Sequence, residues 1–97
     1  MKKHLDVQFE QGARVEIAEA YNWYENQKTG LGDLFNKAIE KTLSSIQKSP
    51  EAYIQTQNHR QITVKKFPFV VLYEVIDKTL YIDAVFHTSR DPKEKLK

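Results

Sequence analysis

The stretch FPFVVLYEVIDKTLYIDAVFH, residues 67–87, carries most of the information about the fold of this sequence. Residues 67–76 are apolar on both faces apart from Glu74, a pattern typical of a central strand that is covered on both sides. Asp77 and Lys78 then predict a hairpin turn, after which residues 79–87 return as a second strand. Pro68 has no N–H group to donate, so we expect it at the start of its strand.

Two further strands are predicted on the N-terminal side of this hairpin. Residues 60–66, RQITVKK, alternate polar and apolar side chains, and residues 5–9, LDVQF, do the same. Alternation with a period of two residues predicts strands with one buried face.

Two helices are predicted between these strands. Apolar residues recur at helical spacing from Ala13 to about Gln27, and again over residues 31–48. Gly30 and Gly32 lie between the two patterns and permit a tight reversal of the chain. The segment SPEAY, residues 49–53, predicts one further helical turn that begins at a capping serine.

The predicted order of elements is therefore β-α-α-β-β-β. We expect an α+β fold in which a helical hairpin packs on one face of a mainly antiparallel four-stranded sheet. With 97 residues, the chain has room for a single domain spanning residues 1–97.

Composition excludes several classes of function. The chain has no cysteine, so it has neither disulfides nor thiolate zinc sites, and a reducing cytoplasm is the expected location. No apolar run has the length of a signal peptide or a membrane span, so no membrane association is expected. His4, His59 and His87 lack the spacing of metal-binding motifs, and no metal or other cofactor is predicted.

The strand at 79–87 ends in the polar stretch HTSRDP. Strict alternation places Leu80, Ile82, Ala84 and Phe86 under the helices. His87 is then expected to face away from the helices, beside Asp83. Three roles stay open for it: a hydrogen-bonded structural residue, a docking point for a partner, or a general acid–base.

Basic and aromatic residues supply the other candidate positions. The net charge of +2 is too small to indicate nucleic-acid binding by itself. Arg60, Lys65 and Lys66 form an acid-free basic stretch, and Arg90 lies in the basic tail. Arg60 and Arg90 can serve as structural anchors, with Arg90 reaching carbonyl groups or the carboxylates of Asp83 and Glu74, or as contacts to a partner.

Trp23 lies off the apolar stripe of its helix, where it either anchors a partner or covers the edge of the core.

In order and spacing, these segments resemble the RelE/ParE superfamily of type II toxin–antitoxin toxins, and most closely its ParE-like branch. The resemblance spans nearly the whole chain and rests on FEQGARVEIAEAYNWYE (9–25), GLGDLF (30–35), SPEAY (49–53), Arg60 followed by KKFPFVVLYEV (65–75), and IDAVFHTSRDP (82–92).

The resemblance implies a plasmid-stabilisation toxin that inhibits growth and is neutralised by a cognate antitoxin, whose tail wraps the toxin in a hetero-oligomer. ParE-like members poison DNA gyrase, whereas RelE-like members cut mRNA on the ribosome. The nuclease branch tends to carry an arginine in the central strand, but residues 67–73 here contain no cation. The sequence therefore favours inhibition by binding.

Two alternatives stay open. One is a ribosome-dependent endoribonuclease that uses His87 for proton transfer, with Arg60, Lys65 and Arg90 holding phosphate. The other is an inactive member that only binds its antitoxin.

Overall fold

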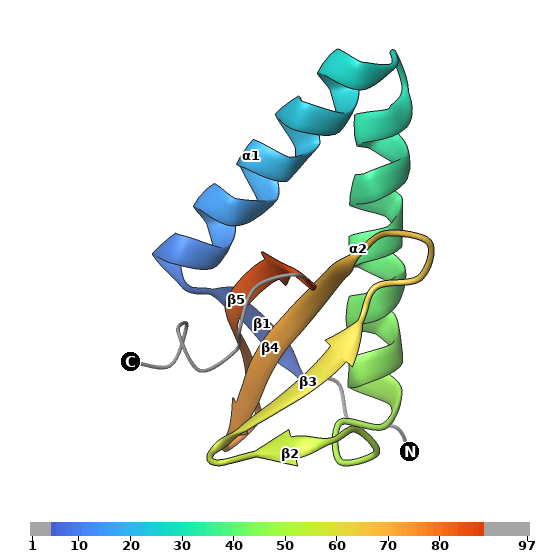
Figure 1. Cartoon of the computed structure of the whole chain (residues 1–97). Helices are drawn as coiled ribbons and strands as arrows, with labels where there is room; N and C mark the ends of the chain where they lie inside the picture. The colour runs from blue at the N-terminus through green and yellow to red at the C-terminus, as the bar shows by residue number, and fades with distance from the viewer. Residues whose placement is uncertain (1–4, 89–97) are drawn as a thin grey trace.

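A computed structural model describes residues 5–88 and shows two helices packed on one face of a sheet (Figure 1). The elements in chain order are β1 (Asp6–Phe9), α1 (Gln11–Gln27), α2 (Leu31–Lys48), β2 (Gln55–Thr56), β3 (His59–Thr63), β4 (Phe69–Ile76) and β5 (Thr79–His87). The predicted α+β class and helical hairpin are confirmed. Among the described residues, neither helix combines the length and the apolar character that crossing a bilayer requires.

The predicted four-stranded sheet is wrong in its number of strands. The sheet has five strands in the order β1-β5-β4-β3-β2, and it is mixed, because β1 runs parallel to β5 while the other pairs are antiparallel. The extra strand, β2, is only two residues long. It forms because the Gln61 N–H donates to the Ile54 carbonyl at 3.0 Å, which lays the preceding segment against β3.

The helical turn predicted at residues 49–53 is also absent. This segment makes a tight non-helical turn in which the Ala52 N–H donates to the Ser49 carbonyl at 3.0 Å. Long-range bonds hold it in this shape. The Tyr73 hydroxyl donates to the Pro50 carbonyl at 2.7 Å, and the Arg60 guanidinium donates to the Tyr53 carbonyl at 2.8 Å. The turn is therefore fixed by the sheet and not by local helix propensity.

The connection between the helices depends on its two glycines. Gly30 has φ of 93°, a left-handed conformation that glycine adopts without steric cost. At Gly32 a Cβ would lie 2.8 Å from the Tyr21 carbonyl oxygen, so only glycine allows this close approach of α1 and α2. The Glu25 carboxylate accepts from the Gly30 and Gly32 N–H groups at 2.9 and 3.0 Å. It thereby pairs two N–H groups at the start of α2 that the helix itself leaves unsatisfied.

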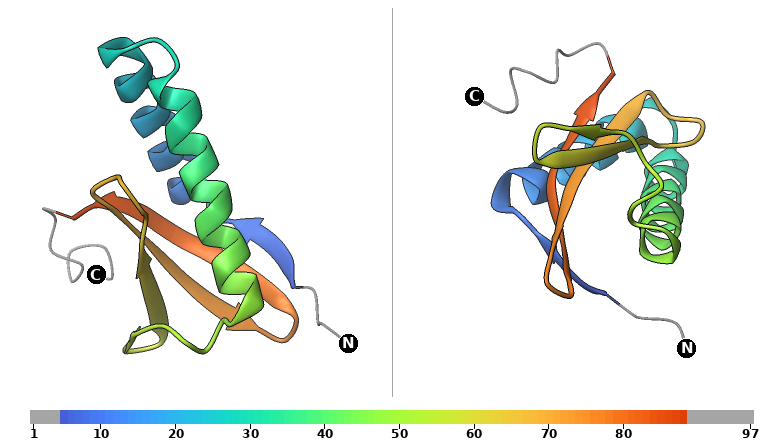
Figure 2. Two further views of the ribbon diagram at one scale, coloured as in Figure 1. Left: turned by 90° about the vertical axis from the view of Figure 1, so that its right-hand side faces the viewer. Right: turned by 90° about the horizontal axis from the view of Figure 1, so that it is seen from below.

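The main core lies between the helices and the sheet. Phe35, Ile39 and Ile46 of α2 pack with Val71 and Tyr73 of β4. Phe35 and Tyr24 belong to a cluster of aromatic rings that also includes Phe67 and Phe69, with centroids 4.9–6.2 Å apart. Beyond this contact, the tip of the hairpin projects past the sheet (Figure 2).

A β-bulge in β5 determines which side chains at the end of this strand face the helices. The register runs regularly from Ile76 opposite Thr79 to Tyr73 opposite Ile82, but Leu72 then lies opposite Ala84, which leaves Asp83 as the extra residue. A bulge shifts the alternation of side chains by one position. Leu80, Ile82 and Val85 consequently face the helices, whereas Ala84 and Phe86 do not.

The sheet face away from the helices, here called the far face, has its own apolar cluster. Its members are Val70, Leu72, Ala84 and Phe86, all of them buried. The prediction that β4 is covered on both faces is confirmed for Val70 to Tyr73, which are buried consecutively, but not for Val75 and Ile76, which are exposed. The prediction that Ala84 and Phe86 lie under the helices is wrong, because the bulge reverses their direction.

Candidate functional site

His87 lies on the helix-covered face, which corrects the prediction that it faces away beside Asp83. Its cross-strand partner is Phe69, and the two rings meet edge to face with centroids 5.4 Å apart. Phe69 in turn packs against Tyr24 and Phe35. The imidazole is exposed at the rim of the aromatic cluster. The bulge at Asp83 is the physical reason, because it inverts the alternation over the last residues of β5.

Arg60 is engaged in holding the backbone. Its guanidinium donates to the carbonyls of Glu51 at 3.3 Å and Tyr53 at 2.8 Å. Arg60 is paired with Tyr73, four residues along β4 from the partner of His87. At a strand rise near 3.3 Å per residue, this separation is about 13 Å. Arg60 and His87 therefore do not share one phosphate-binding site.

Two other predicted cations lie close to His87 in the fold. Lys65 and Lys66 are exposed in the turn between β3 and β4, where Lys66 has φ of 70°. This turn adjoins the end of β5, since the Thr88 N–H donates to the Pro68 carbonyl at 2.8 Å. The structure thus brings these lysines to the end of the sheet that carries His87. Arg90 lies outside the described residues.

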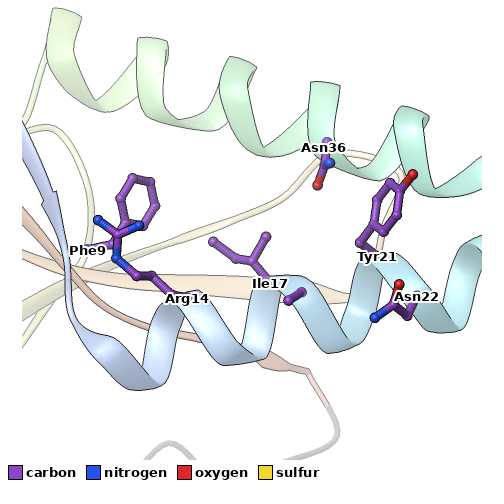
Figure 3. A pocket seen from close by; sticks show the side chains of 7 residues that line it. Phe9, Arg14, Ile17, Tyr21, Asn22 and Asn36 are labelled. Atoms are coloured by element: carbon purple, nitrogen blue, oxygen red, sulfur yellow. The ribbon is translucent and has the colours of Figure 1, made fainter.

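The helical hairpin offers an apolar groove and an exposed aromatic side chain. The groove, about 400 Å³ in volume, opens between α1 and α2 (Figure 3). It is lined by Phe9, Arg14, Ile17, Ala18, Tyr21, Asn22 and Asn36. Trp23 is 58% exposed and contacts Tyr24 edge to face at 5.1 Å. The tryptophan therefore presents most of its surface to solvent.

A second hollow, of about 410 Å³, lies beside β3 and the end of β4. Its lining includes the carboxylates of Glu51, Glu74 and Asp77 but a single cation, Arg60. A hollow with this balance of charge repels phosphate groups, so it is unsuited to RNA.

Three polar side chains converge on the far face, from β3, β4 and β5. The His59 Nε2 atom lies 3.0 Å from Asp83 Oδ2 and 3.5 Å from Glu74 Oε2. Burial, assisted by the neighbouring Glu74 and then Glu10, raises the pKa of Asp83 to about 7. We call these three residues the histidine–carboxylate cluster.

Sequence spacing did not reveal this cluster. Metal-binding motifs such as HxH and HxxxH place ligands close together in the sequence, whereas His59 is 15 residues from Glu74 and 24 from Asp83. A usable signal was present, since Glu74 and Asp83 are the two acidic residues within the apolar strands of the predicted hairpin. The sequence does not show the register of β3 on β4, which pairs Arg60 with Tyr73 and so sets His59 beside Glu74.

Comparisons with known proteins agree with this fold. A search among curated protein sequences finds no significant match. A solved structure described as the chromosomal ParDE TA system from P. aeruginosa is similar, with a TM-score of 0.70 and 15% identity, covering 89% of this chain and 98% of that one. At this identity the likeness concerns the fold. The family model of the ParE toxin of the type II toxin–antitoxin system parDE matches residues 7–92. The chain therefore belongs to the ParE toxin family of type II toxin–antitoxin systems.

Proposed function

We propose that this protein is a cytoplasmic growth-inhibiting toxin that acts by binding a large target, DNA gyrase, and is neutralised by a cognate antitoxin. Membership of the ParE toxin family supports the toxin role. The observation that carries the binding mechanism is the placement of Arg60. Its guanidinium is bonded to two backbone carbonyls, and its backbone position is about 13 Å along the sheet from that of His87.

Cleavage of RNA through its 2′-hydroxyl needs an acid–base pair and several cations gathered around one phosphate. Within residues 5–88, the central strand β4 carries no cation, and Val70 to Tyr73 are buried in apolar clusters. Neither hollow described above includes His87 in its lining. These features support recognition of a protein surface in place of bond cleavage.

Trp23 is the strongest candidate for a contact to the target. Tryptophan is enriched among residues that dominate binding energy, and Trp23 is 58% exposed on the hairpin that projects from the sheet. Its ring is supported from one side by Tyr24, which is itself packed on the core. A supported, exposed ring loses little conformational freedom on binding.

The groove between the helices has the chemistry expected of a binding site for the antitoxin tail. It combines apolar walls from Phe9 and Ile17 with the cation of Arg14, which lies 5.6 Å from the centre of the Phe9 ring. An amphipathic helix with an acidic residue beside its apolar face matches this chemistry. We propose that the antitoxin docks here and forms a hetero-oligomer with the toxin.

Inhibition of purified gyrase tests the proposal directly. The full chain is expected to inhibit DNA supercoiling, and Trp23→Ala should raise the concentration needed for half inhibition about tenfold or more. Val15→Ala is the matched control, because Val15 is a 44% exposed apolar residue of the same helix. It should leave inhibition unchanged.

Unimpaired supercoiling at a large excess of folded protein would reject gyrase as the target. Equal loss of inhibition in both variants would reject Trp23 as the anchor. For the antitoxin, Arg14→Glu should weaken co-purification with the product of the adjacent gene, while gyrase inhibition persists.

One observation favours the alternative of a ribosome-dependent endoribonuclease. His87 and the exposed Lys65 and Lys66 lie at the same end of the sheet. Primer extension on transcripts from induced cells tests it. Codon-associated cuts that disappear in His87→Ala would establish cleavage, whereas intact transcripts in growth-arrested cells would remove it.

A further inference from the structure

The histidine–carboxylate cluster joins three neighbouring strands of the sheet. His59 begins β3, Glu74 lies in β4 and Asp83 is the bulged residue of β5. Each residue offers one ligand atom, and the three atoms lie within 4.8 Å of one another. These residues contribute to none of the surfaces assigned above to gyrase or to the antitoxin.

The contact between His59 and Asp83 is close but is not a hydrogen bond. The His59 Nε2 and Asp83 Oδ2 atoms are 3.0 Å apart, yet Asp83 Oδ2 is buried without any hydrogen-bond partner. The His59 Nδ1 atom is likewise buried and unpartnered. Since buried polar atoms in native proteins are almost always satisfied, the unpartnered Asp83 Oδ2 beside His59 Nε2 requires an explanation.

The separations fit a metal ion held between the ligand atoms. Zinc binds imidazole nitrogen and carboxylate oxygen at roughly 2.0–2.2 Å, so neighbouring ligands of a tetrahedral ion lie about 3.3 Å apart. The measured distances from His59 Nε2 are 3.0 Å to Asp83 and 3.5 Å to Glu74. Ligand atoms that converge on a common ion approach one another in this way without directing hydrogen bonds at each other.

The bulge lies at Asp83 itself, within the cluster. In a regular hairpin register Asp83 would lie directly opposite Leu72, but the extra residue places it between the partners of Leu72 and Tyr73. Bulges commonly redirect a side chain next to a functional site. Here the carboxylate of the bulged residue lies 3.0 Å from the imidazole of His59, on the other side of β4.

Burial and access also suit a bound ion. The side chains of His59, Glu74 and Asp83 are 21%, 30% and 16% exposed, which limits competition from water. Glu74 also lines the acidic hollow of about 410 Å³, which gives a cation an entry path. One imidazole with two carboxylates is a donor set that suits zinc-like divalent ions, with water completing the coordination.

We propose that His59, Glu74 and Asp83 bind a divalent transition-metal ion of the zinc class. The ion links β3, β4 and β5 on the far face and satisfies Asp83 Oδ2, a buried atom without a hydrogen-bond partner. This proposal is independent of the target of the toxin.

Calorimetric titration of ZnCl₂ into the untagged, EDTA-treated full chain tests the proposal. One ion per chain is expected to bind, with a rise in melting temperature. His59→Gln and Asp83→Asn should each weaken binding at least about tenfold, since even indirect changes around a metal site cost that much. His87→Gln is the matched control, an exposed histidine outside the cluster, and should bind zinc like the wild type.

A second measurement uses the unmodified protein, so it does not depend on the variants folding. Zinc should shift the imidazole ¹⁵N resonance of His59 Nε2, and not that of His87, in NMR spectra. The site is rejected if zinc binding is absent, if His59→Gln binds as tightly as the wild type, or if His87 responds in place of His59.

Discussion

The two faces of the sheet differ in whether their buried polar groups have hydrogen-bond partners. On the helix-covered face, the Tyr73 hydroxyl donates to the Pro50 carbonyl at 2.7 Å, and the Glu16 carboxylate accepts from the Val85 N–H at 2.8 Å. On the far face, a small apolar cluster adjoins His59 and Asp83, each of which has a buried atom without a hydrogen-bond partner. Both faces bury apolar side chains. The polar groups named on the helix-covered face are hydrogen-bonded, whereas those named on the far face have atoms that are not.

This difference separates stability from function. A buried donor or acceptor without a partner costs about 1–3 kcal/mol, so a fold keeps such groups where a ligand can satisfy them. We therefore expect substitutions on the helix-covered face to act mainly on the free energy of unfolding. Substitutions in the histidine–carboxylate cluster should act mainly through pH and metal ions.

The largest effect on stability is expected when a buried phenylalanine is replaced by alanine, a change that can be made on either face of the sheet. Phe35→Ala, at a fully buried position against the helices, should lower the free energy of unfolding by about 3–5 kcal/mol. Phe86→Ala, in the four-residue far cluster, should cost less because fewer neighbours line the cavity. Urea denaturation measures both. Equal costs would show that the two faces contribute alike.

The next largest effect on stability is expected at Gly32, where α1 and α2 pack closely. Gly32→Ala places a Cβ 2.8 Å from the Tyr21 carbonyl oxygen and should destabilise the protein by about 1–3 kcal/mol. Gly12→Ala is the matched control, since no atom lies within 4 Å of its Cβ, and it should stabilise α1 by up to about 1 kcal/mol. Thermal unfolding of both variants gives the comparison, and a neutral Gly32→Ala would contradict it.

Asp83→Asn tests the far face through pH, in the presence of EDTA. Burial and the carboxylates of Glu74 and Glu10 raise the pKa of Asp83 from 3.8 to about 7, although His59 also faces it. Because the folded state favours the protonated acid, its contribution is complete below about pH 4 and is lost as pH rises through 7. The variant should therefore gain stability over the wild type with rising pH, reaching on the order of 1–2 kcal/mol at pH 8 after allowance for solvent screening.

Unfolding curves at several pH values measure this difference. Asp6→Asn, an exposed carboxylate on β1, controls for the general effect of removing one negative charge. A gain for Asp83→Asn that shrinks with rising pH would contradict the assignment.

Tyr73→Phe tests the satisfied hydroxyl on the helix-covered face. The substitution removes the donor to the Pro50 carbonyl and should cost about 1 kcal/mol. Burial raises the pKa of Tyr73 to about 12, so Tyr73→Phe should leave the change in tyrosine absorbance between pH 7 and pH 10 the same as in the wild type while the protein stays folded. Tyr81→Phe is the control for loss of a hydroxyl, because Tyr81 is a half-buried tyrosine on the neighbouring strand β5.

The smallest effect on stability is expected at Trp23. Trp23→Ala should change the free energy of unfolding by less than about 0.5 kcal/mol, because the side chain is 58% exposed. A larger loss would show that the ring covers the edge of the core, which was the alternative interpretation of its position.

Most of the elements were predictable from local patterns. The limits of both helices and of β5 were predicted to within about two residues, and the turn at Asp77 is confirmed, with φ of 56°. The short strand β2 was missed because its two residues carry no periodic signal. The direction of His87 was wrong because the prediction assumed strict alternation through residue 83.

By itself the sequence determined the helical hairpin, the doubly buried central strand and the family resemblance, since each depends on the spacing of apolar residues along a short segment. Only the tertiary structure decided which way the end of β5 faces, what holds Arg60, and that His59 meets Glu74 and Asp83. For the end of β5, the physical reason is the bulge at Asp83. One extra residue in a strand leaves the local pattern almost unchanged but reverses every side chain that follows.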